Sequence, residues 1–141
     1  MTREEILEFF ARRDAAWQRH DFAALAAEHT EDGEVDSPLW GKVKGSKAIQ
    51  SIYIQWFSSF PDAAYFTEHL LIDGNEAVQF IKMSGTQKGE FCGLPPTGKR
   101  FEIRCAFLFF FADDRIVHEF RLYDFTGILL QLGVLKAKPA F

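Results

Sequence analysis

Residues 100–124, RFEIRCAFLFFFADDRIVHEFRLYD, carry the pattern that decides the fold. Two β-rich apolar runs flank the acidic pair Asp113-Asp114, which is typical of an antiparallel hairpin. Side chains alternate between the two faces of a strand, so the odd positions from Phe101 to Phe111 form one apolar row. We expect this row to face the core of the protein.

The rest of the chain predicts helices first and strands afterwards. Alternating apolar residues continue upstream of the hairpin and are interrupted by turn residues at Asp73-Gly74-Asn75, so four long strands form an antiparallel meander. Before them, Thr2 and Glu5 have the form of a capping box, and apolar residues recur at helical spacing. We predict an α+β fold with the helices on one face of the sheet. The predicted helices cover 3–19, a segment after Asp21 that ends near His29, the stretch from Ser46 to Phe60, and 128–132. The predicted strands cover 34–37, 64–72, 77–87, 100–111 and 115–124. Residues 41–45 are expected to form neither a helix nor a strand.

Composition limits the classes of function. The 141 residues form one predicted domain, 1–141, in which 48% of residues are hydrophobic and sixteen are Phe. A net charge of −4 with scattered Lys and Arg argues against nucleic acid as a partner. No signal peptide follows Met1 and no apolar run is long enough to span a membrane, so we expect no membrane partner and a cytoplasmic protein. Cys92 and Cys105 are expected to be reduced, and the four histidines lack metal-ligand spacing, so no metal is predicted.

Asp124 is the first candidate catalytic residue. Alternation along the last strand places Ile116, His118, Phe120, Leu122 and Asp124 on one face, which is apolar apart from its two titratable groups. A carboxyl group in such surroundings loses solvation, which raises its pKa toward the range useful for proton transfer near neutral pH. The alternative is structural, because Asp124 stands three residues before Gly127 and could cap the C-terminal helix.

His118 and Asp36 are candidate helpers of Asp124. His118 could orient a bound carbonyl group, although a core histidine with satisfied hydrogen bonds explains it as well. Asp36 stands at a strand end, where it could act as a second pocket acid or form an Asx turn before Pro38.

The abundant aromatic residues predict either a packed core or an apolar ligand pocket, because both use the same side chains. The even positions Leu108 and Phe110 would lie on the outer face of the sheet, where an exposed apolar patch predicts a homodimer interface. The predicted pocket residues are Trp17, Trp40, Tyr53, Trp56, Met83, Cys105, Phe107 and Phe120.

Three segments of the C-terminal half resemble one known family. The segment 91–99, FCGLPPTGK, is followed by a strand that ends at Asp124 and then by 129–134, LLQLGV. With this order of elements the chain resembles the SnoaL-like polyketide cyclases of the nuclear transport factor 2-like superfamily. The resemblance implies a cone of curved antiparallel sheet wrapped around the N-terminal helices, a deep apolar pocket for a small apolar molecule, and a dimer.

The resemblance also implies an activity. In these cyclases the aspartate on the last strand is the acid/base of an intramolecular aldol ring closure that needs no cofactor, and Asp124 stands at that position. Family members commonly carry Glu-His-Trp where this chain has His118-Glu119-Phe120. We therefore expect a cofactor-independent cyclase or isomerase.

Other functions stay open. One alternative is a non-catalytic protein that binds or carries an apolar small molecule, since this fold is often used without chemistry. Another is a subunit whose outer sheet face binds a different chain. Steroid isomerisation is not expected, because the second pocket acid and the helix-one tyrosine of ketosteroid isomerase fall near Phe107 and Arg13.

Overall fold

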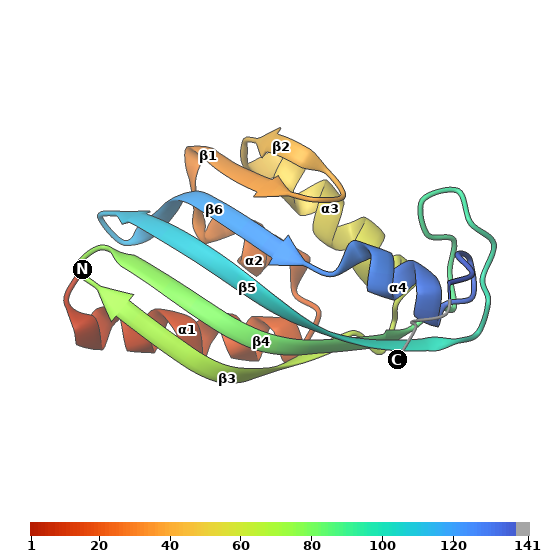
Figure 1. Ribbon diagram of the computed structural model, residues 1–141. Coiled ribbons are helices and arrows are strands. Elements are labelled where there is room, and N and C mark those ends of the chain that lie inside the picture. Colours follow the sequence, from red (N-terminus) through yellow and green to blue (C-terminus); the bar gives the residue numbers. More distant parts are fainter. Residues whose placement is uncertain (138–141) are drawn as a thin grey trace.

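A computed structural model describes residues 1–137, which form a six-stranded sheet with four helices. The strand order is β2-β1-β6-β5-β4-β3 (Figure 1). All neighbouring strands run antiparallel except β1 and β6, which are parallel. The strands are β1 (His29–Ser37), β2 (Gly41–Lys44), β3 (Ala64–Asp73), β4 (Glu76–Thr86), β5 (Arg100–Ala112) and β6 (Arg115–Tyr123).

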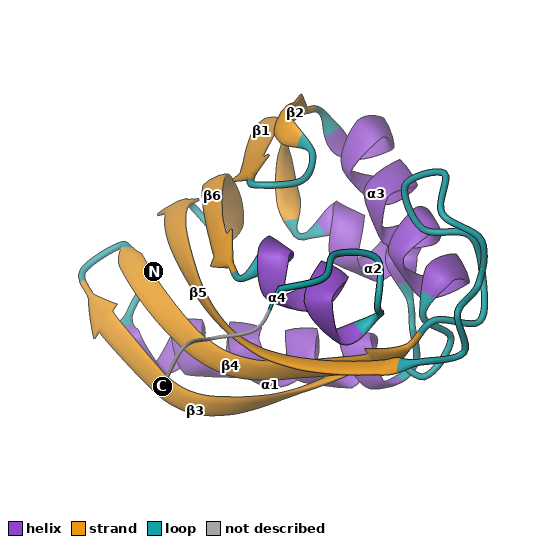
Figure 2. Ribbon diagram, turned by 45° about the vertical axis from the view of Figure 1, so that its right-hand side comes forward, coloured by secondary structure: helices purple, strands orange, loops and turns teal. Residues whose placement is uncertain are grey.

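The helices lie against one face of this curved sheet. Figure 2 shows the strands bending around α1, α2 and α3, while the opposite face of the sheet carries no helix among the residues described. The prediction of an α+β fold with a curved sheet wrapped around N-terminal helices is confirmed. The helices are α1 (Arg3–Gln18), α2 (Phe22–Ala27), α3 (Ser46–Ser59) and α4 (Phe125–Gln131).

Local sequence signals explain where most helices begin. The hydroxyl of Thr2 accepts a hydrogen bond from the Glu5 amide, and the Glu5 carboxylate accepts one from the Thr2 amide, so the predicted capping box is present. Asp21 caps α2 by accepting a hydrogen bond from the Ala24 amide. The helix predicted from Ser46 to Phe60 is α3, and its N-cap is Gly45, whose φ of 93° suits glycine.

Two strand predictions need correction. The first strand begins at His29, five residues earlier than predicted, and residues 41–44 form strand β2 instead of staying open. Both changes follow from pairing, because β1 takes hydrogen bonds from β2 on one side and from β6 on the other. Such partners are distant in sequence, so local patterns do not reveal them.

The aromatic row of β5 forms the core, as the alternation predicts. The odd positions of β5 are buried beneath the helices, and α1 packs onto them through edge-to-face contacts. The ring centroids of Phe10 and Phe109 are 5.0 Å apart, and those of Phe9 and Phe111 are also 5.0 Å apart. This packing fixes α1 across the inner face of the sheet.

An irregularity in β6 decides which of its side chains face inward. Phe111 pairs with Ile116 but Phe110 pairs with His118, so Val117 is an extra residue in the ladder. Beyond this bulge the inward positions of β6 are Glu119, Arg121 and Tyr123, while their neighbours face outward. Simple alternation from Ile116 therefore assigns the wrong face to the rest of the strand.

No helix among residues 1–137 is long and apolar enough to cross a membrane.

Candidate functional site

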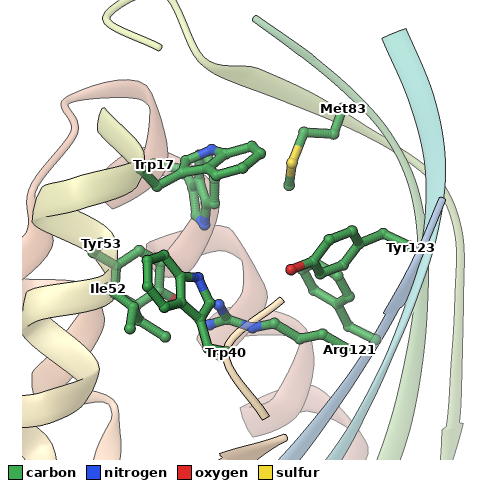
Figure 3. Close-up of a pocket in the computed structure, with 9 residues that line it drawn as sticks. Trp17, Trp40, Ile52, Tyr53, Met83, Arg121 and Tyr123 are labelled. Atoms are coloured by element: carbon green, nitrogen blue, oxygen red, sulfur yellow. The ribbon is translucent and has the colours of Figure 1, made fainter. Parts of the chain in front are cut away.

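A pocket lies between the inner face of the sheet and helices α1 and α3 (Figure 3). Its cavity volume is about 30 Å³, and the space between the surrounding side chains, including the part open to solvent, is about 440 Å³. A ligand larger than water therefore needs the surrounding side chains to move apart. The lining residues are Trp17, Trp40, Ile52, Tyr53, Trp56, Met83, Phe107, Arg121 and Tyr123.

The walls of the pocket are mainly aromatic but offer unused hydrogen-bond donors. Trp17 comes from α1 and Trp56 from α3, and the indole Nε1 of each is buried without a hydrogen-bond partner within the described residues. A buried N–H group without a partner is costly in free energy. An acceptor atom on a ligand, or a water molecule, would satisfy these two groups.

Arg121 supplies the positive charge of the pocket. Its guanidinium group lies over the ring of Tyr53, 5.1 Å from the centroid, and over the ring of Phe107, 5.5 Å from the centroid. Arg121 Nε donates to Glu119 Oε1 at 2.9 Å, and Nη2 donates to the Tyr53 hydroxyl at 2.7 Å. Nη1 makes no hydrogen bond within the described residues, so it is the free donor of the group.

Glu119 joins Arg121 to a buried cluster beneath the pocket. This carboxylate, which has no exposed surface, also accepts from Arg13 Nη2 at 3.1 Å and contacts His29 Nε2 at 2.9 Å. Burial alone would raise its pKa, but the charges of Arg121 and Arg13 together with the contact from His29 hold the pKa of Glu119 well below its usual value. Glu119 is therefore a carboxylate, and its charge offsets the charges of the two arginines.

Tyr123 places a hydroxyl group in the pocket. Figure 3 shows its oxygen pointing toward the space between Trp40 and Met83. Burial raises the pKa of Tyr123, and hydrogen bonds from Ser37 and the Leu39 backbone act against this shift without cancelling it. The hydroxyl therefore keeps its proton at neutral pH.

Most of the predicted pocket residues line this pocket. Six of the eight are among the lining residues, and Cys105 and Phe120 are not. Cys105 is buried on the inner face of β5, where burial raises the pKa of its thiol to about 12. Phe120 pairs with Leu108 and lies on the outer face of the sheet, so its predicted place in the pocket is wrong.

The two predicted helpers also lie on the outer face. His118 pairs with Phe110 and its ring stacks on Phe120, with centroids 4.1 Å apart. Asp36 is aligned with Phe120 across the parallel β1–β6 pair, so it shares this face. The structure thus brings His118, Asp36 and Phe120 together, but on the side of the sheet opposite the pocket. The bulge at Val117 is the reason for the placement of His118 and Phe120.

Asp124 is the N-cap of α4. Its side chain is exposed and accepts a hydrogen bond of 2.8 Å from the Gly127 amide, and it is not among the lining residues. The prediction that Asp124 faces the pocket is wrong, and the alternative, a helix cap, describes its side chain. A catalytic role for Asp124, His118 or Asp36 stays a prediction that this placement does not support.

Sequence reasoning missed Arg13, Glu119 and Arg121, although two signals were available. Arg13 stands in the apolar stripe of the first helix, four residues after Phe9 and four before Trp17. Glu119 and Arg121 are opposite charges two residues apart, which places them on the same face of a strand. A buried arginine needs a buried partner, so these signals together point to an inward-facing ion pair.

Comparisons with known proteins agree with this architecture. The family model of the SnoaL-like polyketide cyclases matches residues 8–132. The chain belongs to this family.

Several solved structures share the fold. TsrD from Streptomyces laurentii is 23% identical with a TM-score of 0.84, and the match covers 96% of this chain and 99% of that one. A putative SnoaL-like polyketide cyclase from Jannaschia sp. CCS1 is 19% identical with a TM-score of 0.81 and covers 94% of each chain. IdmH from Streptomyces antibioticus, a putative polyketide cyclase, is 24% identical with a TM-score of 0.76, covering 90% of this chain and 97% of that one. No curated protein matches the chain.

The pocket of this SnoaL-like protein contains donors of hydrogen bonds but no ionisable base. Among the residues described, no carboxylate and no imidazole lines it, and no group of three or more His, Cys, Asp or Glu side chains is placed to hold a metal ion. Arg121, Tyr123 and the two indoles can instead bind oxygen atoms that carry negative charge. The arrangement is therefore suited to stabilising an enolate or alkoxide within apolar walls.

The capping role of Asp124 predicts the effect of replacing it. Asp124→Ala should lower the free energy of unfolding by about 1 kcal/mol, because the Gly127 amide loses its acceptor. Asp124→Asn keeps a capping oxygen, so it should lower the free energy of unfolding by less than about half of the loss in Asp124→Ala. Urea unfolding of the three proteins measures both differences. Equal loss in both variants would contradict a capping role.

The lowered pKa of Glu119 predicts a pH dependence of stability. Its contribution should be complete above the unfolded value near 4.5 and should be lost as the pH falls toward the lower folded pKa. The difference in free energy of unfolding between the wild type and Glu119→Gln should therefore shrink as the pH falls from about 7 to about 3. Denaturation at a series of pH values measures it. A difference independent of pH would show that Glu119 is not an ion in the folded state.

Proposed function

We propose that this protein is a cofactor-independent cyclase that closes a ring in a polyketide-like molecule by an aldol-type reaction in the pocket of Figure 3. One observation carries the proposal: an apolar, aromatic pocket is lined by a guanidinium donor and a protonated tyrosine, both from inward positions of β6. Once the side chains have moved apart to admit it, a flexible chain is folded by the apolar walls, which leave room for few water molecules. The two polar groups stabilise charge that develops on oxygen.

The first step is loss of a proton from the carbon between two carbonyl groups. Such a carbon is acidic because the charge of the resulting enolate is spread over two oxygens. Arg121 Nη1 stabilises that charge in a pocket with little water, which lowers the barrier to its formation. Water takes the proton, since the described lining offers no carboxylate or imidazole to act as the base.

The second step forms the carbon–carbon bond. The enolate carbon attacks a second carbonyl carbon of the same molecule, and the electron pair of that carbonyl moves to its oxygen. The alkoxide then takes the proton of the Tyr123 hydroxyl, and the tyrosinate regains a proton from solvent. Atoms and charge balance without an oxidant, a reductant or a metal ion.

A second candidate function is binding without turnover. A carrier of an apolar carbonyl compound needs no base, and the described lining has none. In that case the two indole donors and Arg121 hold the ligand, and Tyr123 is a further hydrogen-bond donor.

Tyr123→Phe separates the two functions. For a cyclase, kcat should fall about a hundredfold or more, because the alkoxide loses its proton donor, while the dissociation constant rises less than about tenfold. A synthetic poly-β-ketone long enough to close a six-membered ring serves as the substrate, and its ring closure is followed by ultraviolet absorbance. The matched control is Tyr65→Phe, which removes a hydroxyl outside the pocket. Wild-type protein that binds the ketone without accelerating ring closure supports the carrier instead.

We also propose that the protein forms a homodimer through the outer face of the sheet. This face exposes large apolar side chains, with Leu122 and Phe66 each 68% exposed and Leu71 60% exposed. Its charges differ between the two sides: Glu34 and Asp36 lie on β1, and Lys82 lies on β4, while Arg104 on β5 is already paired with Glu68 at 3.0 Å. A two-fold axis through the face brings the acidic side of one copy to the basic side of the other.

The dimer predicts an effect of a charge at the centre of this face. Leu122→Asp should raise the dimer dissociation constant at least about tenfold, because a carboxylate would have to be buried at the interface. Leu7→Asp is the control, since Leu7 is an exposed apolar residue of α1 on the helical side. Sedimentation equilibrium measures both. A wild type that stays monomeric, or one that pairs only with a different chain, would contradict the homodimer.

A further inference from the structure

One guanidinium nitrogen of the pocket, Arg121 Nη1, is free to bind a ligand, and its position is set by the hydrogen bonds of the other two nitrogens. Arg121 has three nitrogens, of which Nε and Nη2 are occupied by acceptors in the protein and Nη1 has no partner within the described residues. Because a guanidinium group is planar and rigid, fixing two of its nitrogens also fixes the direction of the third. The acceptors that hold Nε and Nη2 therefore determine where Nη1 points.

Glu119 supplies most of these acceptors. Its Oε1 accepts from Arg121 Nε at 2.9 Å, and its Oε2 accepts from Arg121 Nη2 at 3.3 Å. The two bonds are side by side, so the carboxylate grips one edge of the guanidinium plane. Glu119 lies two residues from Arg121 on the same face of β6, which places the carboxylate beneath the guanidinium group.

The carboxylate is itself held by two further residues of the cluster. Arg13 Nη2 donates to Oε1, and His29 Nε2 lies 2.9 Å from Oε2. Arg13 and His29 are each 1% exposed and come from α1 and β1, so Glu119 is fixed by elements outside its own strand. Arg13 also shares the Tyr53 hydroxyl with Arg121.

Glu119 also keeps the two arginines together. Both guanidinium groups bind Glu119 Oε1 and the Tyr53 hydroxyl, so two positive charges lie close to each other in a buried place. Tyr53 is neutral and cannot offset this repulsion, and Glu28 contacts only Arg13 within the described residues. Without the charge of Glu119, Arg121 would turn away from Arg13 and carry Nη1 out of its present direction.

We propose that Glu119 is the positioning residue of this site, which aims Arg121 Nη1 at the ligand. The inference rests on the proposed function in one respect, since it takes Arg121 as the group that contacts the ligand. Glu119 itself does not line the pocket and so acts only through Arg121.

A double-mutant cycle tests this dependence. The probe is benzoylacetone, a planar β-diketone whose enolate absorbs in the near ultraviolet. Glu119→Gln and Arg121→Lys should each weaken its binding about tenfold, and the double variant should be no weaker than Arg121→Lys alone. A residue that merely stabilises the fold would give additive losses, about a hundredfold in the double variant. Additive losses, or unchanged binding in folded Glu119→Gln, would overturn the proposal.

The Nε–H resonance of Arg121 gives a readout that needs no ligand. In the wild type this resonance should be sharp and protected from exchange with water. It is assigned as the signal that disappears in Arg121→Lys. It should be lost or strongly shifted in Glu119→Gln but kept in Tyr53→Phe, which removes only one of the acceptors of Nη2. If the wild type does not bind benzoylacetone, the proposed ligand class fails while this signal still decides the role of Glu119.

A second variant covers the case in which Glu119→Gln does not fold. Glu119→Asp keeps the charge but shortens the side chain by one methylene group, so the protein should fold, with the Arg121 signal shifted and benzoylacetone binding weakened about tenfold. Circular dichroism establishes folding in each case. If neither variant folds, Glu119 serves stability alone and the positioning role is overturned.

Discussion

The buried carboxylate of Glu119 is the contact on which the pocket depends. It has no exposed surface, and it joins side chains from α1, β1 and β6, which are distant in sequence. Two arginines in an interior of low dielectric constant would repel each other without it. The helix that carries Arg13, the inner face of β6 and the start of β1 are therefore tied to one point, directly beneath the aromatic walls of the pocket.

Local patterns predicted much of the fold, because the signals concerned are local. The capping box at Thr2, the Asp21 cap and the aromatic row of β5 each depend on residues close in sequence, and all three are present. The same reasoning predicted the hairpin at Asp113-Asp114, which joins β5 to β6. Most of the aromatic lining could be predicted as well, since the helical stripes that carry Trp17 and Tyr53 turn toward the sheet.

The polar part of the site could not be predicted from the same patterns. Hydrophobicity favoured the face of β6 that carries Phe120 and Leu122, yet the face that carries Glu119 and Arg121 is the buried one. Two facts reverse the expectation: Val117 shifts the ladder by one residue, and Arg13 on α1 supplies a charge for Glu119. The bulge is an irregularity in strand pairing, and the Arg13–Glu119 contact joins residues 106 positions apart. Single-sequence periodicity contains neither.

The energetics of the cluster explain what buried ion pairs beside this pocket contribute. Burying Arg13, Glu119 and Arg121 costs solvation, and apolar side chains of the same volume would often stabilise a fold equally well or better. Apolar side chains in this place, however, would not orient a ligand. The ion pairs leave one guanidinium donor free in an otherwise aromatic wall, while the remaining nitrogens stay satisfied within the protein. A carbonyl oxygen that enters the pocket then contacts a fixed positive charge. This contact offsets the hydration that the oxygen loses, and no other atom of the ligand gains the same compensation.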